Sequence, residues 1–193
     1  MFPTLFCKPD HTGILFRRQT ADASGTITIR SLIPELDLHT IHQWVNAPYA
    51  KLFWQQDGSF QKLKHTYQHI LSHLQAHSFV AFYNDKLVGQ ADFYAIECDE
   101  LAQHLPHDKD QCGIHIITLP PKEHPAKRLS LQVLLAFAAF YFSFPQAARL
   151  YGEPDHRNEK VHLLIKRAGF SFVKQIRLTN KTANLFCLHR NNF

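Results

Sequence analysis

The most informative stretch of the chain runs Gly152-Glu153-Pro154-Asp155-His156-Arg157-Asn158-Glu159-Lys160-Val161-His162 and ends, one helix later, in Ala168-Gly169-Phe170. Residues 149–153 have the apolar character of a short strand, and Asn158 is a favourable N-cap for a helix that Gly169 would close. That helix would bury one apolar face, made by Val161, Leu164, Ile165 and Ala168. The stretch therefore predicts a strand, a turn and a helix in direct succession.

Upstream of this stretch, strand-like and helix-like patterns follow one another. Residues 26–30 alternate polar and apolar side chains, whereas the residues after Asp37 and after Ser59, two favourable cap residues, space their apolar side chains as in helices. Two strand-like runs flank a turn at residues 84–86 and predict a hairpin. The predicted elements are strands at 26–30, 78–83, 87–96 and 113–119 and helices at 37–45 and 59–75.

Farther along the chain, residues 129–144 are apolar on nearly every side, which predicts a buried helix that Pro145 ends. Residues 172–178 and 183–189 predict the last two strands. The predicted order mixes strands with helices that can cover both faces of one sheet, which places the chain in the α/β (α+β) class. This layout by itself is compatible with many functions.

Residues 1–25 differ from the rest because polar and turn-forming residues interrupt them. We interpret them as an N-terminal extension with one short strand around residues 14–16. Residues 26–193 would then form a single domain, which suits a chain of 193 residues. The sequence leaves open whether the protein is a monomer or a homodimer.

The composition excludes several classes of protein. Hydrophobic residues make up 45% and charged residues 19% of the chain, as in a globular domain. No apolar run is long enough to span a bilayer, and residues 1–8 do not resemble a secretory signal, so we expect a cytoplasmic protein without a membrane partner. The cysteines are predicted to be free thiols outside any zinc-spaced cluster, and no metal is expected: Cys7, Cys98, Cys112 and Cys187.

The formal charge is +5, with 14 histidines counted as neutral. Lysine and arginine are spread along the chain without an arginine-rich run or a nucleic-acid-binding module, so we do not expect a nucleic-acid partner. A small anionic ligand, such as a phosphate-rich cofactor, explains this modest excess of positive charge equally well.

Three motifs taken together resemble one family. Residues 152–160, followed by a helix and Ala168-Gly169-Phe170, resemble the pattern GEPD-x-RN-x-K…AGF of a subgroup of GNAT acyltransferases. The opening HxWxN…FW of that subgroup is matched by His42, Trp44, Asn46 and Phe53-Trp54. Its GxHI strand is matched by residues 113–116. The matches keep the order of the family and cover the chain from about residue 26 to its end, and their combination is far more specific than AGF alone.

The subgroup includes the hydroxylysine acetyltransferases of aerobactin-type siderophore assembly and the lysine acyltransferases of mycobactin assembly. The resemblance implies the GNAT fold, an acyl-CoA donor, and direct acyl transfer to a small amine or hydroxylamine acceptor in a ternary complex. The acceptor in this subgroup is an N6-hydroxylysine, an N-hydroxylated diamine or a lysine side chain. The hydroxamate product is an iron ligand.

The resemblance implies His115 and Asp155 as catalytic residues. A histidine, with an ordinary pKa of about 6.5, can take a proton from the attacking nitrogen at neutral pH. Asp155 would orient this imidazole or serve as a second acid/base. The structural alternatives are a core histidine bonded to the backbone and a loop aspartate that supports the turn into the next helix, with Glu153 and Arg157 as a local ion pair.

The resemblance places the segment that carries Trp44, Phe53 and Trp54 against the acceptor, with His42 as a polar contact or a support. A flat apolar wall there would pack on the methylene groups of a lysine-like chain. Asp92 and Tyr94 share one face of the strand predicted at 87–96, where Asp92 would recognise a cationic acceptor. The alternatives are core packing for the aromatic residues and a solvated strand edge for Asp92 and Tyr94.

The loop at residues 120–128 departs from the family pattern. GNAT enzymes usually carry Q/R-x-x-G-x-G/A here, and the glycines let backbone amides approach the CoA pyrophosphate. This loop has no glycine, and Pro125 has no N–H to donate. Three side chains would supply positive charge in their place, unless they only form a solvated basic loop: Lys122, Lys127 and Arg128.

The resemblance completes the cofactor site with Asn158 and with a backbone N–H of Ile116 or Ile117, which would polarise the thioester carbonyl. Two other hypotheses remain open. One is a GNAT enzyme for another amine, such as an aminoglycoside, against which the basic charge balance argues mildly. The other is a non-catalytic GNAT-fold binding protein, which the missing glycines favour and the retained histidine and aspartate oppose.

Overall fold

The computed structural model describes residues 13–106, 108 and 110–193. The described residues form one mixed sheet of eight strands in the order β1-β2-β3-β4-β5-β6-β8-β7. Its strands are β1 (Phe16–Gln19), β2 (Thr26–Ser31), β3 (Ala76–Tyr83), β4 (Lys86–Ala95), β5 (Gln111–Thr118), β6 (Arg149–Gly152), β7 (Ser171–Arg177) and β8 (Thr182–His189). The α-helices are α2 (Pro34–Val45), α3 (Pro48–Trp54), α4 (Phe60–Ser72), α5 (Leu129–Phe142) and α6 (Glu159–Arg167). Short 3₁₀ turns are η1 (Ile96–Cys98), η2 (Glu100–Gln103), η3 (Pro121–Glu123) and η4 (Arg190–Asn192).

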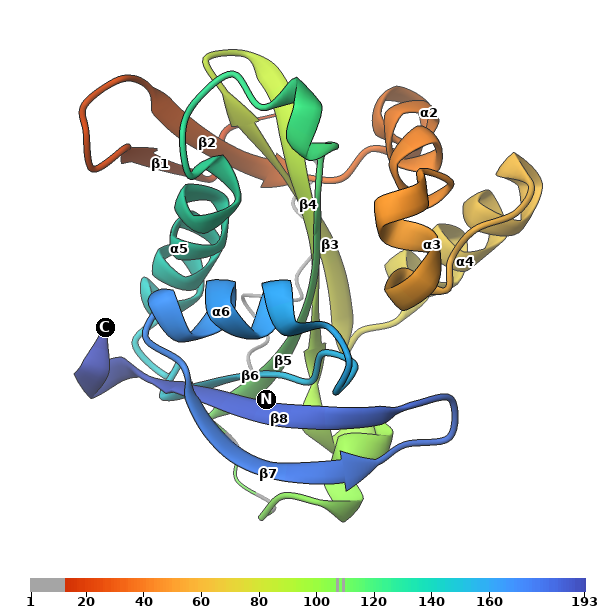
Figure 1. Cartoon of the computed structure of the whole chain (residues 1–193), viewed down its shortest axis with the longest axis vertical. Coiled ribbons are helices and arrows are strands. Elements are labelled where there is room, and N and C mark those ends of the chain that lie inside the picture. The colour runs from red at the N-terminus through yellow and green to blue at the C-terminus, as the bar shows by residue number, and fades with distance from the viewer. Residues whose placement is uncertain (1–12, 107, 109) are drawn as a thin grey trace.

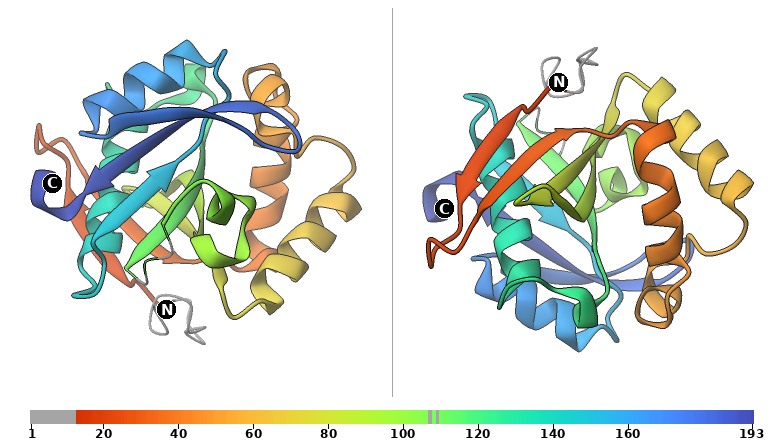
Figure 2. Two further views of the ribbon diagram at one scale, coloured as in Figure 1. Left: turned by 90° about the horizontal axis from the view of Figure 1, so that it is seen from below. Right: turned by 90° about the horizontal axis from the view of Figure 1, so that it is seen from above.

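Helices cover both faces of the sheet, as predicted (Figure 1). The aromatic side chains of α5 pack on one face, where Phe93 of β4 stacks on Tyr141 with ring centroids 6.0 Å apart. On the other face lie α2, α3 and α4, which bury Trp44 and Tyr67. Two further views show the two groups of helices on opposite sides of the strands (Figure 2). This layering leaves the middle of the sheet, between β4 and β6, for the site.

β5 and β6 diverge after a short parallel ladder. Only three residue pairs join them, the last being Gly113 with Tyr151. Beyond Gly113, β5 stays paired with β4 as far as Thr118, while β6 stays paired with β8 through Gly152. One edge of β5 is therefore without a partner strand after Gly113, among the residues that the structure describes.

The start of α2 differs from the prediction. The helix begins at Pro34, so Asp37 lies inside its first turn and is not the N-cap. The buried Asp37 carboxylate accepts from the backbone N–H of Ile33 at 2.7 Å and pairs with Arg30 at 2.7 Å. Its side chain thus still satisfies an amide at the helix start, but from a position that cap preferences alone do not identify.

Two other elements differ from the prediction: α3 is an additional helix, and β1 begins where the strand predicted around residues 14–16 ends. The sequence patterns do not predict α3, which begins at Pro48, where proline is favoured in a first turn. β1 lies within the predicted N-terminal extension and pairs with β2, Phe16 opposite Ile29. The described part of that extension therefore contributes the edge strand of the sheet.

Three of the cysteines are free thiols, namely Cys98, Cys112 and Cys187. Cys7 and the other residues of the segment 1–12 lie outside the described residues. In the described part of the chain, no helix is both long and apolar enough to cross a bilayer.

Candidate active site

His115 and Glu153 face each other where β5 and β6 diverge. His115 lies two residues beyond Gly113, and Glu153 lies two residues beyond Tyr151, the partner of Gly113 in the ladder. Because side chains alternate along a strand, both residues lie on the same face. His115 Nε2 and Glu153 Oε1 are 2.6 Å apart, and Glu153 is 4% exposed. This hydrogen bond therefore connects the two strands across the point where their backbones part.

Two further side chains bind the Glu153 carboxylate. The Tyr94 hydroxyl donates to Oε2 at 3.0 Å, and its ring reaches across β5 above Gly113. A Cβ atom at position 113 would overlap that ring, so the contact requires glycine there. Lys181 Nζ, from the turn between β7 and β8, lies 3.4 Å from Oε1. The carboxylate is thus held by groups from three separate elements.

Burial and charge act in opposite directions on this pair. Burial raises the pKa of Glu153, but His115 and Lys181 lower it to about 2. Burial and Lys181 lower the pKa of His115, but Glu153 and, to a smaller extent, Asp92 outweigh them and raise it above its ordinary value. Glu153 is therefore a carboxylate at neutral pH and accepts the Nε2–H of His115. When the imidazole is neutral, this hydrogen bond leaves Nδ1 as the acceptor nitrogen.

The Nδ1 side of His115 is available to a ligand. Nε2 bonds to Glu153, and Nδ1 bonds to none of the described residues. Of the His115 side chain, 43% remains exposed. A histidine whose tautomer is set by a buried carboxylate and whose other nitrogen is accessible has the arrangement of a general base.

Asp155 does not contact His115, so the predicted pairing of these two residues is wrong. Its Oδ1 accepts from the backbone N–H and from Nε of Arg157, both at 2.9 Å, and its Oδ2 accepts from Nη2 at 2.8 Å. Hydrogen bonds from Arg157 lower the pKa of Asp155 to about 2. Its backbone carbonyl accepts from the N–H of Asn158 at 2.9 Å. Asp155 therefore holds the turn into α6, and Glu153 has the position beside His115.

Two predicted aromatic residues do lie around His115. The Tyr94 ring is tilted against the imidazole with centroids 4.8 Å apart. The Trp54 ring, at the end of α3, meets it edge-on at 6.4 Å. The indole nitrogen Nε1 of Trp54 is buried without a hydrogen-bond partner among the described residues. These rings give the site an apolar wall with one unused donor.

Asp92 lies opposite His115 in the ladder between β4 and β5. Its Oδ1 accepts from Ser78 Oγ at 2.5 Å and from Gln90 Nε2 at 2.6 Å. Burial raises the pKa of Asp92 above its ordinary value. Oε1 of Gln90 is buried without a partner in the described part of the chain, and Oδ2 of Asp92 receives no hydrogen bond there either. The cluster therefore offers two unused acceptors, one of them on Asp92, the cross-strand neighbour of His115.

His42 and Trp44 have supporting positions. His42 Nε2 lies 2.8 Å from the carbonyl oxygen of Gly58, and its ring meets Phe60 edge-on, so it supports the loop before α4. Trp44 is 3% exposed and belongs to the main hydrophobic core, which is the alternative that the sequence left open. Of the aromatic residues in the opening motif, Trp54 is the one that contacts His115.

The unpaired edge of β5 presents backbone amides. The N–H of Leu119 donates to the carbonyl of Val88 in β4 at 3.1 Å. Because the N–H direction alternates along a strand, the amide of Ile117 also faces β4, whereas that of Ile116 faces the edge that β6 has left. Of the two amides predicted near a thioester, only that of Ile116 is on the open side.

The loop before α5 combines exposed cations with an uncapped helix start. Lys122, Lys127 and Arg128 are exposed, and none forms a side-chain hydrogen bond or ion pair with another described residue. Arg128 precedes the helix with a left-handed φ of 56° and provides no side-chain cap. Ser130 Oγ, in the first turn, lies 3.1 Å from Thr118 Oγ1 at the end of β5. Free amides, hydroxyls and cations together suit a phosphate group.

Asn158 caps α6, as its sequence position predicts. Its Oδ1 accepts from the N–H of Val161 at 3.3 Å, and Gly169 ends the helix with a φ of 95°. The predicted contact between Asn158 and a cofactor remains a prediction.

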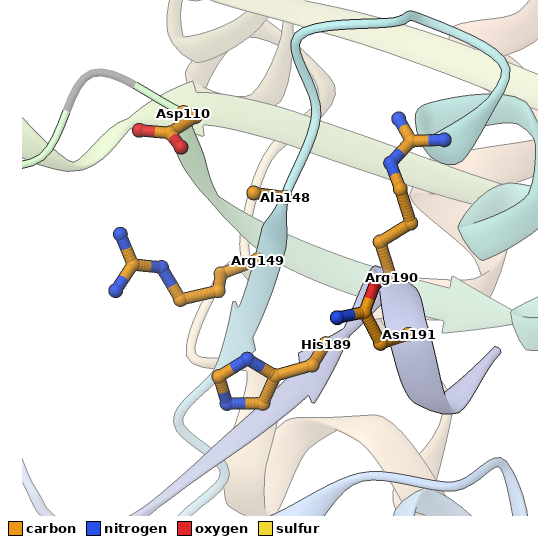
Figure 3. A pocket seen from close by; sticks show the side chains of 6 residues that line it. All are labelled: Asp110, Ala148, Arg149, His189, Arg190 and Asn191. Carbon is orange, nitrogen blue, oxygen red and sulfur yellow. The ribbon is translucent and has the colours of Figure 1, made fainter.

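A separate cavity of about 270 Å³ lies at the other end of β6 (Figure 3). Its lining residues are Asp110, Ala148, Arg149, His189, Arg190 and Asn191. Its arginines are already engaged, because Arg149 pairs with Asp108 at 2.5 Å and Arg190 donates to the carbonyls of Ala147 and Phe142 near the end of α5. None of the residues around His115 lines this cavity, so it is not part of the candidate site.

Sequence reasoning missed two members of the site, Glu153 and Lys181. Glu153 lies in the most specific motif, and the signal that selects it over Asp155 is the register of β5 against β6, which no local pattern contains. Lys181 lies in a turn outside every motif, and nothing in the sequence singles it out.

The family model of the acetyltransferase (GNAT) domain matches residues 33–178. The N(6)-hydroxylysine O-acetyltransferase of Escherichia coli is 20% identical over 96% of this chain and 59% of its own length. The N-hydroxyputrescine acetyltransferase of Acinetobacter baumannii is 25% identical over 90% of this chain and 82% of its own. The chain thus spans less than two thirds of the Escherichia coli relative.

Among solved structures, the aminoglycoside acetyltransferase AAC(6')-Ib, in complex with coenzyme A, has a TM-score of 0.77 at 18% identity. The similarity covers 86% of this chain and 96% of that one. At this identity the likeness concerns the fold alone, and together with the family match it confirms the predicted fold.

Proposed function

This chain belongs to the GNAT acetyltransferase family, and on that premise we propose that it transfers an acyl group from an acyl-CoA to the nitrogen of an N-hydroxylated diamine or of hydroxylysine. The product would be a hydroxamate for siderophore assembly in the cytoplasm. The observation that carries the proposal is the hydrogen bond between His115 Nε2 and Glu153 Oε1, where β5 and β6 diverge. The names of two relatives, which refer to N(6)-hydroxylysine and to N-hydroxyputrescine, support this class of acceptor.

His115 is the proposed general base. Its Nδ1 takes the proton of the acceptor nitrogen as that nitrogen attacks the thioester carbon. A C–N bond forms, the C–S bond breaks, and the electron pair leaves with the CoA sulfur, without a covalent link to the enzyme. Glu153 stabilises the imidazolium that results and keeps Nε2–H directed away from the acceptor. A hydroxylamine is unprotonated near neutral pH, so His115 acts during the attack and need not deprotonate the free acceptor.

Three features of the chain fit an acyl-CoA. The N–H of Ile116, on the open edge of β5, would donate to the thioester carbonyl. The uncapped start of α5 would face phosphate groups, as helix starts commonly do. The exposed cations of the preceding loop would add charge in place of the missing glycines: Lys122, Lys127 and Arg128.

The acceptor would lie against Trp54 and Tyr94, beside the open nitrogen of His115. Oε1 of Gln90 and Nε1–H of Trp54 are buried and unused, and Oδ2 of Asp92 accepts no hydrogen bond from a described residue. Unsatisfied buried groups of this kind are costly, so a ligand that supplies their partners gains affinity. An acceptor rich in N–H and O–H groups, such as a hydroxylamine with an ammonium group, meets this requirement.

The test is a titration followed by an acceptor panel. The purified protein is titrated calorimetrically with acetyl-CoA and with a longer acyl-CoA, and CoA thiol release is then measured with N-hydroxyputrescine, N6-hydroxylysine, lysine and an aminoglycoside. We expect binding of one donor at roughly 1–100 μM and the highest kcat/KM with a hydroxylated acceptor. Turnover of the aminoglycoside alone would move the function to that class of amine. A folded protein that binds neither donor would overturn the catalytic proposal in favour of a non-catalytic binding protein.

A further inference from the structure

Glu153 carries a second cation on the oxygen that bonds to His115. Lys181 Nζ is 3.4 Å from Oε1, and His115 Nε2 is 2.6 Å from the same atom. The side chain of Lys181 is 16% exposed, and Glu153 is its ion-pair partner within the described ranges. A buried ammonium group is costly unless a negative charge compensates it, and the Glu153 carboxylate provides that charge for Lys181.

The turn that carries Lys181 is anchored on both sides of the site. The backbone N–H and Oγ1 of Thr179 donate to Glu100 Oε2 at 2.9 and 3.0 Å. Asn180 Nδ2 donates to Gln55 Oε1, just beyond α3, at 3.2 Å. Both views of Figure 2 show the turn between β7 and β8 beside α3. The ammonium group is therefore delivered to Glu153 from a segment held in place by its neighbours.

The charges around His115 are otherwise negative. The carboxylates that act on it are Glu153 after β6, Asp92 on β4 and Asp99 before η2. Tyr94, also on β4, is uncharged. α3 contributes the uncharged Trp54. Lys181 is a cation among these groups, and it lowers the pKa of His115. An imidazole surrounded by carboxylates alone would hold its proton too firmly to serve as a base near neutral pH.

We propose that Lys181 is a positioning residue for the acyl transfer, which shares Glu153 Oε1 with His115 and thereby increases the fraction of the imidazole that is neutral and ready to accept a proton. The ammonium group offsets part of the negative charge of Glu153 and repels a proton on His115, while the hydrogen bond that sets the tautomer stays intact. This inference rests on the proposed role of His115 as general base.

The direct test is a titration of the His115 ring by NMR, which needs no substrate. Histidine-labelled wild type, Lys181→Met and Lys181→Arg are compared, and the His115 signal is identified by its loss in His115→Gln. We expect the midpoint to move to higher pH in Lys181→Met and to stay near the wild-type value in Lys181→Arg, which keeps the charge. An unchanged or lowered midpoint in Lys181→Met overturns the proposal. Lys181→Gln replaces Lys181→Met if circular dichroism shows that the latter does not fold.

The kinetic test uses the same variants. On the acid limb of the pH profile, kcat/KM of Lys181→Met should fall roughly fivefold, since a nearby unit charge acts with about this strength through water, and should approach wild type on the alkaline plateau. A higher KM for the acceptor at every pH, with the NMR midpoint unmoved, would mean that Lys181 binds substrate, and the proposal would be wrong. A moved midpoint in a protein without transferase activity would count against the proposed function and leave the effect of Lys181 on His115 standing.

Discussion

Glu153 and Asp155 are two residues apart in the sequence, and both are buried carboxylates whose pKa is lowered to about 2. Their partners differ in origin. Glu153 is bound by His115, 38 residues earlier, and by Lys181, 28 residues later, whereas Asp155 is bound by Arg157, two residues later. A lowered pKa therefore does not by itself identify a functional carboxylate. The better indicator here is how far apart in the sequence the carboxylate and its partners lie.

The backbone between the two residues explains the difference. Glu153 continues directly from β6, so its side chain keeps the strand direction toward β5. Pro154 follows, and Asp155 then makes only an isolated bridge with Ala183 before the turn into α6. One proline is thus enough to separate a carboxylate that faces a neighbouring strand from one that organises its own turn.

The largest effect is expected at the partner of Glu153. His115→Gln should lower kcat by about 10²- to 10⁴-fold, because the proposed general base is lost, with little change in acyl-CoA binding. Steady-state kinetics and calorimetry measure both quantities. His65→Gln, an exposed histidine on α4, is the matched control. A kcat within threefold of wild type would show that His115 is not the general base. Glu153 would then also lose its proposed role of orienting that base.

Glu153→Gln tests the carboxylate whose partners are distant in the sequence. We expect kcat/KM to fall roughly 10- to 100-fold, a part of the general-base contribution. Glu153 raises the pKa of His115, so its neutralisation should move the acid limb of the pH profile to lower pH. The limb is measured from kcat/KM between pH 5 and 9, a range of about four units around the ordinary histidine value. A limb that stays in place would show that the two groups are not coupled.

Asp155→Asn tests the local carboxylate. It should lower the free energy of unfolding by about 1–3 kcal/mol through weakened bonds to Arg157, with kcat within about threefold of wild type. The lowered pKa of Asp155 means that its stabilisation is present above the ordinary value of 3.8 and is lost as the pH falls toward 2. Urea denaturation at several pH values should therefore show a smaller acid dependence in the variant. Loss of kcat with unchanged stability would restore Asp155 as the second acid/base implied by the resemblance.

The smallest effects are expected for charges that have neither a distant nor a local partner. Alanine at Lys122, Lys127 or Arg128 should raise KM for acyl-CoA by less than about fivefold each, and high salt should reduce the difference. Lys166→Ala, an exposed lysine at the end of α6, is the control. If all three variants bind acyl-CoA like wild type at low salt, the loop is only a solvated basic segment.

Sequence reasoning succeeds where the determinant is local. Ser59 and Asn158 cap the helices that they predict, because a cap bonds to an amide three residues away. The two strands around residues 84–86 form the expected hairpin for a similar reason. Asp37 is the exception, since a proline three residues earlier already starts the helix.

The site is predicted only in part, because some of its contacts depend on residues that are far apart in the sequence. Trp54, Tyr94 and Asp92 lie next to His115, and their roles toward a substrate stay predictions. The choice of Glu153 over Asp155 depends on a parallel ladder between strands separated by a helix, and the place of Lys181 depends on a turn anchored by residues from two other elements. Both are tertiary facts, which no pattern of neighbouring residues encodes.

The brevity of the β5–β6 ladder has a mechanical consequence. Three residue pairs join these strands, fewer than in the other ladders of the described sheet. The five strands before this ladder and the three after it form two parts of the sheet that are joined by few backbone hydrogen bonds. We expect the amides of this ladder to exchange first, and the sheet to separate here first under a pulling force. A molecule bound between β5 and β6 would connect the two parts, and the sheet would then resist force as a single unit.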